Sequence, residues 1–382
     1  MSKTKENKKN LIVRIFDVGY GDSILIEFPD GKDGKHLGII DCNSHASSNR
    51  IAESNNQDRS VPKILSYLTN NLNDKKKELD YIVDFICLSH YHIDHYNGMG
   101  CLIKGLQKYN IPIKEFWDPG ISRKKYEALR EMVEKKRSRE KHENATQLSN
   151  IVDVLDRISI DNKLEFKPLV KIEQNIKTIS DVRIDIIAPY GNHWYDYSKY
   201  LVTPGKEDSI MEHLVCSAMM LTYGQGRIIL SADLCNEAWD IIMDKFEEES
   251  LRSNVVKVSH HGSCEGNFPE KSLWDKIAFV DKTVAAISGG YRKDISLKCT
   301  IQELGKYSVL TYCTGNHDDI QYEEPSFTKN KSQAIKHSYR DESKLTIKKA
   351  GSYHGDISIY MDCNGNVTVE PEFDNPVIST NE

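Results

Sequence analysis

Three histidines and one aspartate lie within six residues in the stretch Ser89-His90-Tyr91-His92-Ile93-Asp94-His95. The stretch follows the apolar run 81–88, which has the pattern of a buried strand. Side chains two residues apart on an extended loop point the same way, so His90 and His92 can converge on one metal ion. Asp94 and His95 can then turn towards a second ion. The stretch therefore predicts a metal-binding loop at the end of a strand.

A second carboxylate suited to binding metal follows a predicted hairpin. Alternating runs on either side of Gly224-Gln225-Gly226 predict two paired strands, and the second of them ends near Asp233. A carboxylate at this place can bridge two cations, because each oxygen binds one ion and the negative charge offsets their repulsion. Asp233 is therefore a candidate bridging ligand.

The strand-like run 255–258 leads into a second histidine motif, Ser259-His260-His261-Gly262-Ser263. We expect at least one of its two histidines to bind metal. His260 is the preferred ligand, with His261 as a supporting residue or proton donor, but the sequence does not choose between them. Lys257 is a candidate for binding a substrate anion or stabilising the leaving group, and an outward-facing strand lysine is the alternative.

Composition and charge limit the classes of protein that fit. The chain has 382 residues, of which 39% are hydrophobic and 28% charged, as in soluble globular proteins with a sizeable core. A net charge of -6 argues against an overall basic, nucleic-acid-binding surface, although a local basic groove is compatible with it. The nine cysteines contain no CxxC pair and fit a reducing compartment better than a disulfide framework. No signal peptide or membrane-spanning run is evident, so we expect a cytoplasmic protein without a membrane partner.

Several motifs carry a resemblance to a known family. The segments Phe16-Asp17-Val18-Gly19-Tyr20-Gly21-Asp22-Ser23-Ile24 and Ile39-Ile40-Asp41 resemble the opening of the hydrolase domain of competence-type DNA-uptake proteins and their stand-alone relatives. The HxHxDH pattern of residues 90–95 is similar to the two-metal loop of the metallo-β-lactamase superfamily. The resemblance covers most of residues 11–368 in order.

The resemblance implies a four-layer αββα sandwich of the α+β or α/β class, the metallo-β-lactamase fold, with helical and loop insertions. Two mixed sheets would face each other and helices would cover them. The hydrolase domain would span 11–370, with insertions near 121–180 and 316–350. We expect residues 1–10 to be disordered and residues 371–382 to be frayed.

The resemblance also implies a ligand set for two divalent ions. His90 and His92 would bind the first ion, and Asp94, His95 and His260 the second, with Asp233 between them; Asp94 would also orient the nucleophile. His213 is the best-placed candidate for a third ligand of the first ion. Relatives of the DNA-uptake type often lack a histidine there, so its role is left open. Relatives usually have Thr-Gly-Asp where this chain has Ser231-Ala232-Asp233.

Two segments are candidates for shaping access to the site. Residues 121–148 predict a basic helix that would steer a phosphate-rich substrate, or else a solvated helix of mixed charge. Residues 190–208 contain five aromatic residues and predict an irregular loop, whose rings either stack on nucleobases or pack beneath the loop.

The expected activity is hydrolysis by a water whose pKa two metal ions lower. Zinc is the expected metal because imidazole ligands dominate, and the carboxylates also suit manganese. We expect a phosphodiesterase or nuclease that acts on nucleic acid or a nucleotide. The alternatives are a hydrolase of a small phosphodiester such as a cyclic nucleotide, a lactone, lactam or thioester hydrolase, and a non-enzymatic metal-stabilised subunit of a larger complex. A partner protein or a homo-oligomer is compatible with each.

Overall fold

The computed structural model describes most of the predicted domain. The described residues are 9–29, 35–44, 61–72, 81–119, 151, 164–200, 209–279, 282–289, 298–307, 309–314, 334–336 and 355–371. Several predicted segments lie outside them: residues 1–8, the charged segment 121–148, residues 201–208, nearly all of 316–350 and the end beyond 371.

The described strands form two mixed sheets of eight strands each. The first sheet has the order β16-β15-β1-β2-β3-β4-β5-β6. Its strands are β1 (Leu11–Ile15), β2 (Ser23–Glu27), β3 (Lys35–Cys42), β4 (Tyr81–Cys87), β5 (Ile113–Asp118), β6 (Glu165–Pro168), β15 (Ile357–Met361) and β16 (Val367–Pro371). The β1–β2–β3 meander is antiparallel, whereas β3, β4, β5 and β6 pair in parallel.

The second sheet has the order β14-β13-β12-β11-β10-β9-β8-β7. Its strands are β7 (Glu173–Ile179), β8 (Val182–Ala188), β9 (Ala218–Tyr223), β10 (Gly226–Leu230), β11 (Val255–Lys257), β12 (Val284–Ile287), β13 (Leu310–Cys313) and β14 (Ala334–Lys336). Strands β9 and β10 form the predicted hairpin, with Tyr223 paired to Gly226. Strands β10 to β13 run parallel to one another.

Residues 165–179 belong to the sandwich rather than to an insertion. They supply β6 and β7, which are the edge strands of the first and the second sheet. The prediction of an insertion near 121–180 is therefore wrong for residues 165–179.

Alternation along the strands builds the three apolar layers of the molecule. In β10, Ile228 and Leu230 pack between the two sheets, while Ile229 packs on the outer face of the second sheet. In β4, Phe85 faces the layer between the sheets and Ile86 the outer face of the first. Because successive strand residues point to opposite faces, an almost continuous apolar run can fill two layers at once.

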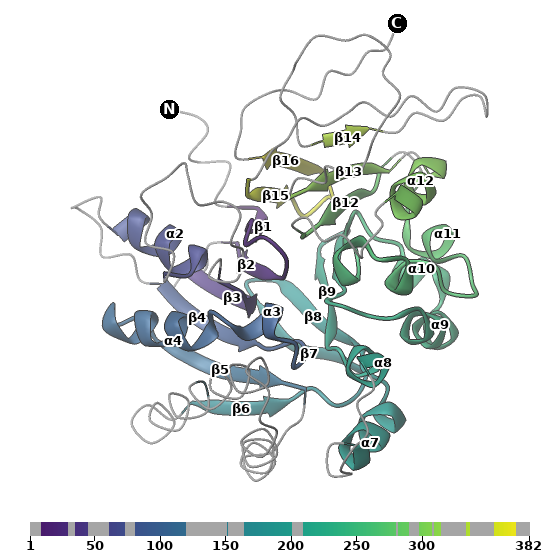
Figure 1. The fold of residues 1–382 in the computed structure, drawn as a ribbon. Coiled ribbons are helices and arrows are strands. Elements are labelled where there is room, and N and C mark those ends of the chain that lie inside the picture. Colours follow the sequence, from purple (N-terminus) through teal and green to yellow (C-terminus); the bar gives the residue numbers. More distant parts are fainter. Residues whose placement is uncertain are drawn as a thin grey trace, which may run out of the picture.

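Helices cover the outer face of each sheet (Figure 1). Helices α2 (Lys63–Leu72) and α4 (Met99–Lys108) pack on the first sheet. The second sheet is covered by α9 (Asn236–Lys245), α10 (Glu248–Leu251), α11 (Leu273–Ile277) and α12 (Lys298–Lys306). The predicted αββα sandwich is thus confirmed.

Three further helices are α3 (Ile93–Tyr96), α7 (Gly191–Tyr200) and α8 (Ser209–Leu214). Helix α7 replaces the first half of the irregular loop expected over 190–208. No helix in the described ranges combines the length and apolar character that crossing a membrane requires.

The carboxyl ends of parallel strands from both sheets meet at one place in this fold. Strands β3 and β4 of the first sheet lead to Asp41 and to the loop 88–95. Strands β10 and β11 of the second sheet lead to Asp233 and to the motif 259–263. Ligands of sheets with parallel strands bind at such carboxyl ends, so the topology gathers the predicted ligands.

Candidate metal centre

The predicted metal-binding loop lies between β4 and α4 and packs against the turn that joins β1 to β2. The backbone N–H of Asp22 donates to the carbonyl oxygen of Asp94 at 3.2 Å. Gly21 has a φ of 124°, and a Cβ at this position would lie 2.2 Å from the same oxygen. The close approach explains why glycine occupies position 21. The segment 16–24, which contains Gly21, thus packs directly beside the loop.

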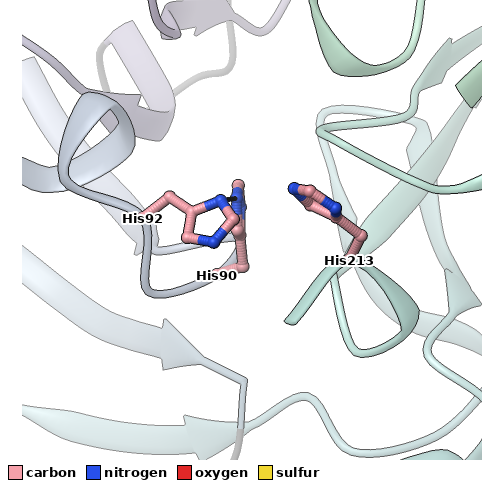
Figure 2. Close-up of side chains that lie close together, drawn as sticks. All are labelled: His90, His92 and His213. Carbon is pink, nitrogen blue, oxygen red and sulfur yellow. Dashed lines mark hydrogen bonds between the residues drawn. The ribbon is translucent and has the colours of Figure 1, made fainter. Parts of the chain in front are cut away.

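The first group of candidate ligands contains His90, His92 and His213, each with one ring nitrogen within 4.8 Å of the others. His90 Nε2 lies 3.0 Å from His92 Nδ1. His213 comes from α8 and lies across from the two loop histidines (Figure 2). The structure therefore brings His213, whose role the sequence left open, to the place of a third ligand.

His213 has the protonation state that a ligand needs. Burial lowers its pKa to about 3, assisted by repulsion from His260. Its Nε2 is buried and has no hydrogen-bond partner. The ring is therefore neutral at physiological pH and has a donor atom available.

The second group contains Asp94, His95, Asp233 and His261. One carboxylate oxygen of Asp233, Oδ2, lies 3.3 Å from His95 Nε2 and 3.2 Å from His261 Nε2. Asp94 Oδ2 lies 3.5 Å from His261 Nε2. Four side chains from three separate segments thus direct donor atoms at one point.

The two histidines of the motif 259–263 separate to different sides of the centre. His261 lies in the second group, where the sequence favoured His260, and His260 instead joins His213 and Asp233. Both residues have a left-handed backbone, with φ of 46° and 52°, so the chain turns sharply and the ring centroids are 6.2 Å apart. Such conformations are uncommon outside glycine and recur at functional sites.

Asp233 belongs to two overlapping groups of candidate ligands. One contains Asp94, His95 and His261, and the other contains His213 and His260. The residue before it, Ala232, has a φ of 48°, where relatives of the resembled family have glycine. Alanine in place of the glycine of Thr-Gly-Asp therefore keeps the same backbone turn, at the cost of a strained left-handed conformation.

Hydrogen bonds on the far side of two rings fix their tautomers. His95 Nδ1 donates to Asp41 Oδ2 at 2.7 Å, and His261 Nδ1 donates to the carbonyl oxygen of Ser288 at 2.9 Å. Asp41 is held in turn by the backbone N–H and the hydroxyl of Ser89, at 2.8 and 2.6 Å. In both rings Nε2 then faces the centre, which is the arrangement of metal-binding histidines with a supporting partner.

The buried atoms without hydrogen bonds show whether metal ions fit. At this centre they are His95 Nε2, His213 Nε2, His260 Nδ1, His261 Nε2 and Asp233 Oδ1. Buried polar atoms are nearly always paired, so several unpaired donors at one place indicate missing partners. Nitrogen and carboxylate ligands in two adjacent groups suit two divalent cations.

Lys257 does not lie where a substrate anion or a leaving group would contact it. The side chain is fully buried, and its Nζ lies 2.7 Å from Asp22 Oδ2 and 3.8 Å from Asp233 Oδ1. It also donates to the carbonyl oxygen of Ala232 at 3.0 Å. A contact with a leaving group is therefore not supported, and Lys257 instead neutralises carboxylates beneath the centre.

Asp22 and Asp41 support the site, and the sequence alone did not indicate their roles. Both lie in segments that carried the family resemblance, but nothing in their spacing indicated that they would support a lysine and a histidine from other strands. Cys264, just after the histidine motif, is disulfide-bonded, which differs from the expectation of free thiols. The other described cysteines, at 42, 87, 101, 216, 235, 313 and 363, form no disulfide.

Comparisons with known proteins found similar solved structures but no match by family model or to a curated protein. Among solved structures, the chain is similar to the metallo-β-lactamase fold protein YhfI from Bacillus subtilis, with a TM-score of 0.37 and 12% identity over 79% of this chain and 96% of that one. It is also similar to a diphosphatase of the PhnP family, with a TM-score of 0.33 and 9% identity over 88% of this chain and all of that one. Similarity at this level carries no argument, so function is argued from the side chains and motifs.

Metal binding at the second group is expected to release protons. Burial lowers the pKa of His261, but the Asp233 carboxylate raises it more, to about 9; Asp233 and Asp41 likewise raise the pKa of His95 against burial. Both rings carry an extra proton near pH 7 without metal, and an ion must displace it to reach Nε2. The affinity for this ion should therefore fall as pH decreases from 9 to 6, by about tenfold per pH unit for each proton released. Zinc titration calorimetry in two buffers of different ionisation enthalpy measures the proton count, and a count of zero would contradict the expectation.

Proposed function

We propose that the protein is a metal-dependent hydrolase with a two-metal centre. One observation carries the proposal: Asp233 belongs both to the group with His95 and His261 and to a group with His213 and His260, and several buried atoms of these side chains lack hydrogen-bond partners. The centre lies at the carboxyl ends of strands from both sheets, where substrates commonly bind.

The residues divide between two ions as follows. His90, His92 and His213 would hold the first; Asp94, His95 and His261 would hold the second; Asp233 would bind both. When bound, the ions would supply Lewis acidity and lower the pKa of a water. We expect zinc, since imidazole ligands outnumber carboxylates, with manganese as the alternative.

His260 is the residue best placed to act on the substrate. It is partly exposed, and its ring lies 4.3 Å, centroid to centroid, from that of His213. Its imidazole can hold a substrate oxygen or move a proton at a ring nitrogen. His260 thus takes the supporting role that the sequence analysis gave to His261, and Asp94, which is also partly exposed, can orient the attacking water.

The proposed substrate class is a phosphodiester, with nucleic acid as the first candidate. The support is the resemblance of the segments 16–24 and 39–41 to hydrolase domains of DNA-uptake proteins. A second candidate is a small phosphodiester such as a cyclic nucleotide, and the net charge of -6 favours it because a polyanion would be repelled. A lactone, lactam or thioester fits the same centre less specifically.

A substrate panel tests the proposal. The purified protein, loaded with zinc or manganese, is incubated with single-stranded and duplex DNA, RNA, cyclic nucleotides and bis-p-nitrophenyl phosphate, beside an Asp233→Ala variant. We expect cleavage of nucleic acid that the variant lacks. Cleavage of the small esters alone would replace nucleic acid with the second candidate. Two bound ions without hydrolysis of any substrate would favour a non-catalytic subunit of a larger complex, and no bound metal would reject the centre itself.

A further inference from the structure

Glu212 forms an ion pair with His92, a proposed metal ligand, but is not itself a member of either ligand group. It lies in α8 directly before His213, and its Oε2 contacts Nε2 of His92. Both side chains are 26% exposed, so the contact lies at the rim of the centre. Adjacent residues of one short helix therefore reach the first group in two ways: His213 supplies a nitrogen, and Glu212 holds another ligand.

The two nitrogens of His92 face different partners. Its Nδ1 lies 3.0 Å from His90 Nε2, on the side of the first group, while its Nε2 faces Glu212. A neutral imidazole has one N–H and one lone pair. With Glu212 accepting the proton on Nε2, the lone pair lies on Nδ1, directed at the position shared with His90.

The other proposed ligands show the same construction with different partners. Asp41 accepts from His95, the carbonyl oxygen of Ser288 accepts from His261, and the hydroxyl of Ser89 lies 3.0 Å from His90 Nδ1. Those partners come from β3 and from residues beside strand ends. Glu212 is different, because the helix that carries it also carries a ligand.

Glu212 therefore connects two segments that the first group requires. The loop after β4 supplies His90 and His92, and α8, which precedes β9 in the other sheet, supplies His213. Near these segments, the backbone N–H of Ser217, which follows α8, donates to the carbonyl oxygen of Ser89 at 2.9 Å. Loss of the Glu212 contact would leave His92 free to rotate away from His213.

We propose that Glu212 is a positioning residue for the first metal ion: it fixes the tautomer and orientation of His92 and ties the loop to α8. The proposal rests on the proposed two-metal centre. It assigns Glu212 to the first ion alone, because the second group has its own partners in Asp41 and Ser288.

Metal binding to Glu212→Ala and Glu212→Gln tests the proposal independently of activity. Cobalt is titrated into the metal-free protein and followed by its visible absorption, and zinc affinities are measured by competition with a chromophoric chelator. We expect Glu212→Ala to lower the affinity for one of the two ions by about 10- to 100-fold. The cobalt spectrum of that ion alone should change. Glu212→Gln, which keeps an acceptor oxygen but not the charge, should lose less.

Two controls separate positioning from folding and from the centre itself. Glu248→Gln removes a partly exposed, ion-paired glutamate of α10 outside both groups and should leave both ions unchanged. Thermal unfolding in chelator should give the same midpoint for wild type and Glu212→Gln. The positioning role would be overturned if both Glu212 variants bound two ions with wild-type affinities and spectra. A wild-type protein that binds fewer than two ions would instead reject the proposed centre.

Discussion

Replacement of Asp233 by asparagine is expected to reduce hydrolysis by roughly 10³-fold or more, the scale of losing a group that stabilises transition-state charge. Asparagine keeps the shape of the side chain but removes the charge that two cations share. Asp233 Oδ2 lies within 3.3 Å of donor nitrogens of both His95 and His261, and the same residue belongs to the group with His213. We therefore expect the variant to lose one bound ion as well. Steady-state kinetics and metal analysis measure the two effects.

Asp185→Asn is the matched control for this experiment. Asp185 is also a buried aspartate, in β8, but it accepts from the backbone N–H of Asn175 and from Arg183, outside both ligand groups. The control should retain both ions and the wild-type rate. Asp233→Asn with two tightly bound ions and an unchanged rate would show that Asp233 bridges nothing.

The fold was predictable where strands carry strong apolar periodicity. Strand β4 before the metal-binding loop, the β9–β10 hairpin, and strand β11 before the motif 259–263 all appear where apolar spacing and turn residues placed them. Strands β6 and β7 were missed because their side chains are largely exposed at the edges of the sheets and carry little apolar alternation. Their register comes from pairing with β5 and β8, which a local pattern does not contain.

Ligand types were easier to predict than their partners. The density of histidine in 90–95 and 259–263 indicated both motifs. Which group His260 and His261 each join depends on their two successive left-handed backbone conformations. A periodicity argument assumes extended or helical backbone and fails there. Glu212 and Asp41 carry no local signal either, because each acts on a histidine from another segment.

The burial of Lys257 was also not predictable from its local sequence. A lysine at the end of a strand is usually exposed, and only the packing of β11 between β10 and β12 makes this one fully buried. The carboxylates that neutralise it come from positions 22 and 233, which are distant in the sequence. The burial changes the expected consequence of mutation from lost catalysis to lost stability.

Lys257→Met is therefore expected to destabilise the metal-free protein by about 3–5 kcal/mol, the cost of removing one partner of a buried ion pair. The Asp22 carboxylate, also fully buried, would lose a cation 2.7 Å away, and Asp233 one at 3.8 Å. Burial lowers the pKa of Lys257, but Asp22 and Asp233 raise it above its ordinary value of 10.5. A raised pKa means that the stabilisation is complete below that ordinary value and is lost only as pH rises through the folded-state pKa, so the full effect should appear at pH 7. Urea unfolding in the presence of chelator measures it.

Lys114→Met and the double variant Asp22→Asn/Lys257→Met separate a buried pair from an exposed one. Lys114 pairs with Asp84 at 2.8 Å but is 47% exposed, so its loss should cost at most about 1 kcal/mol. Because asparagine in place of Asp22 removes the carboxylate that Lys257→Met leaves unpaired, the double variant should lose less stability than the two single variants added together. Additive losses, or a Lys257→Met cost no greater than that of Lys114→Met, would mean that the buried ammonium does not hold Asp22 and Asp233 together. The carboxylate of Asp233 would then have to be held in place by the metal ions themselves, and the metal-free centre would not be preformed.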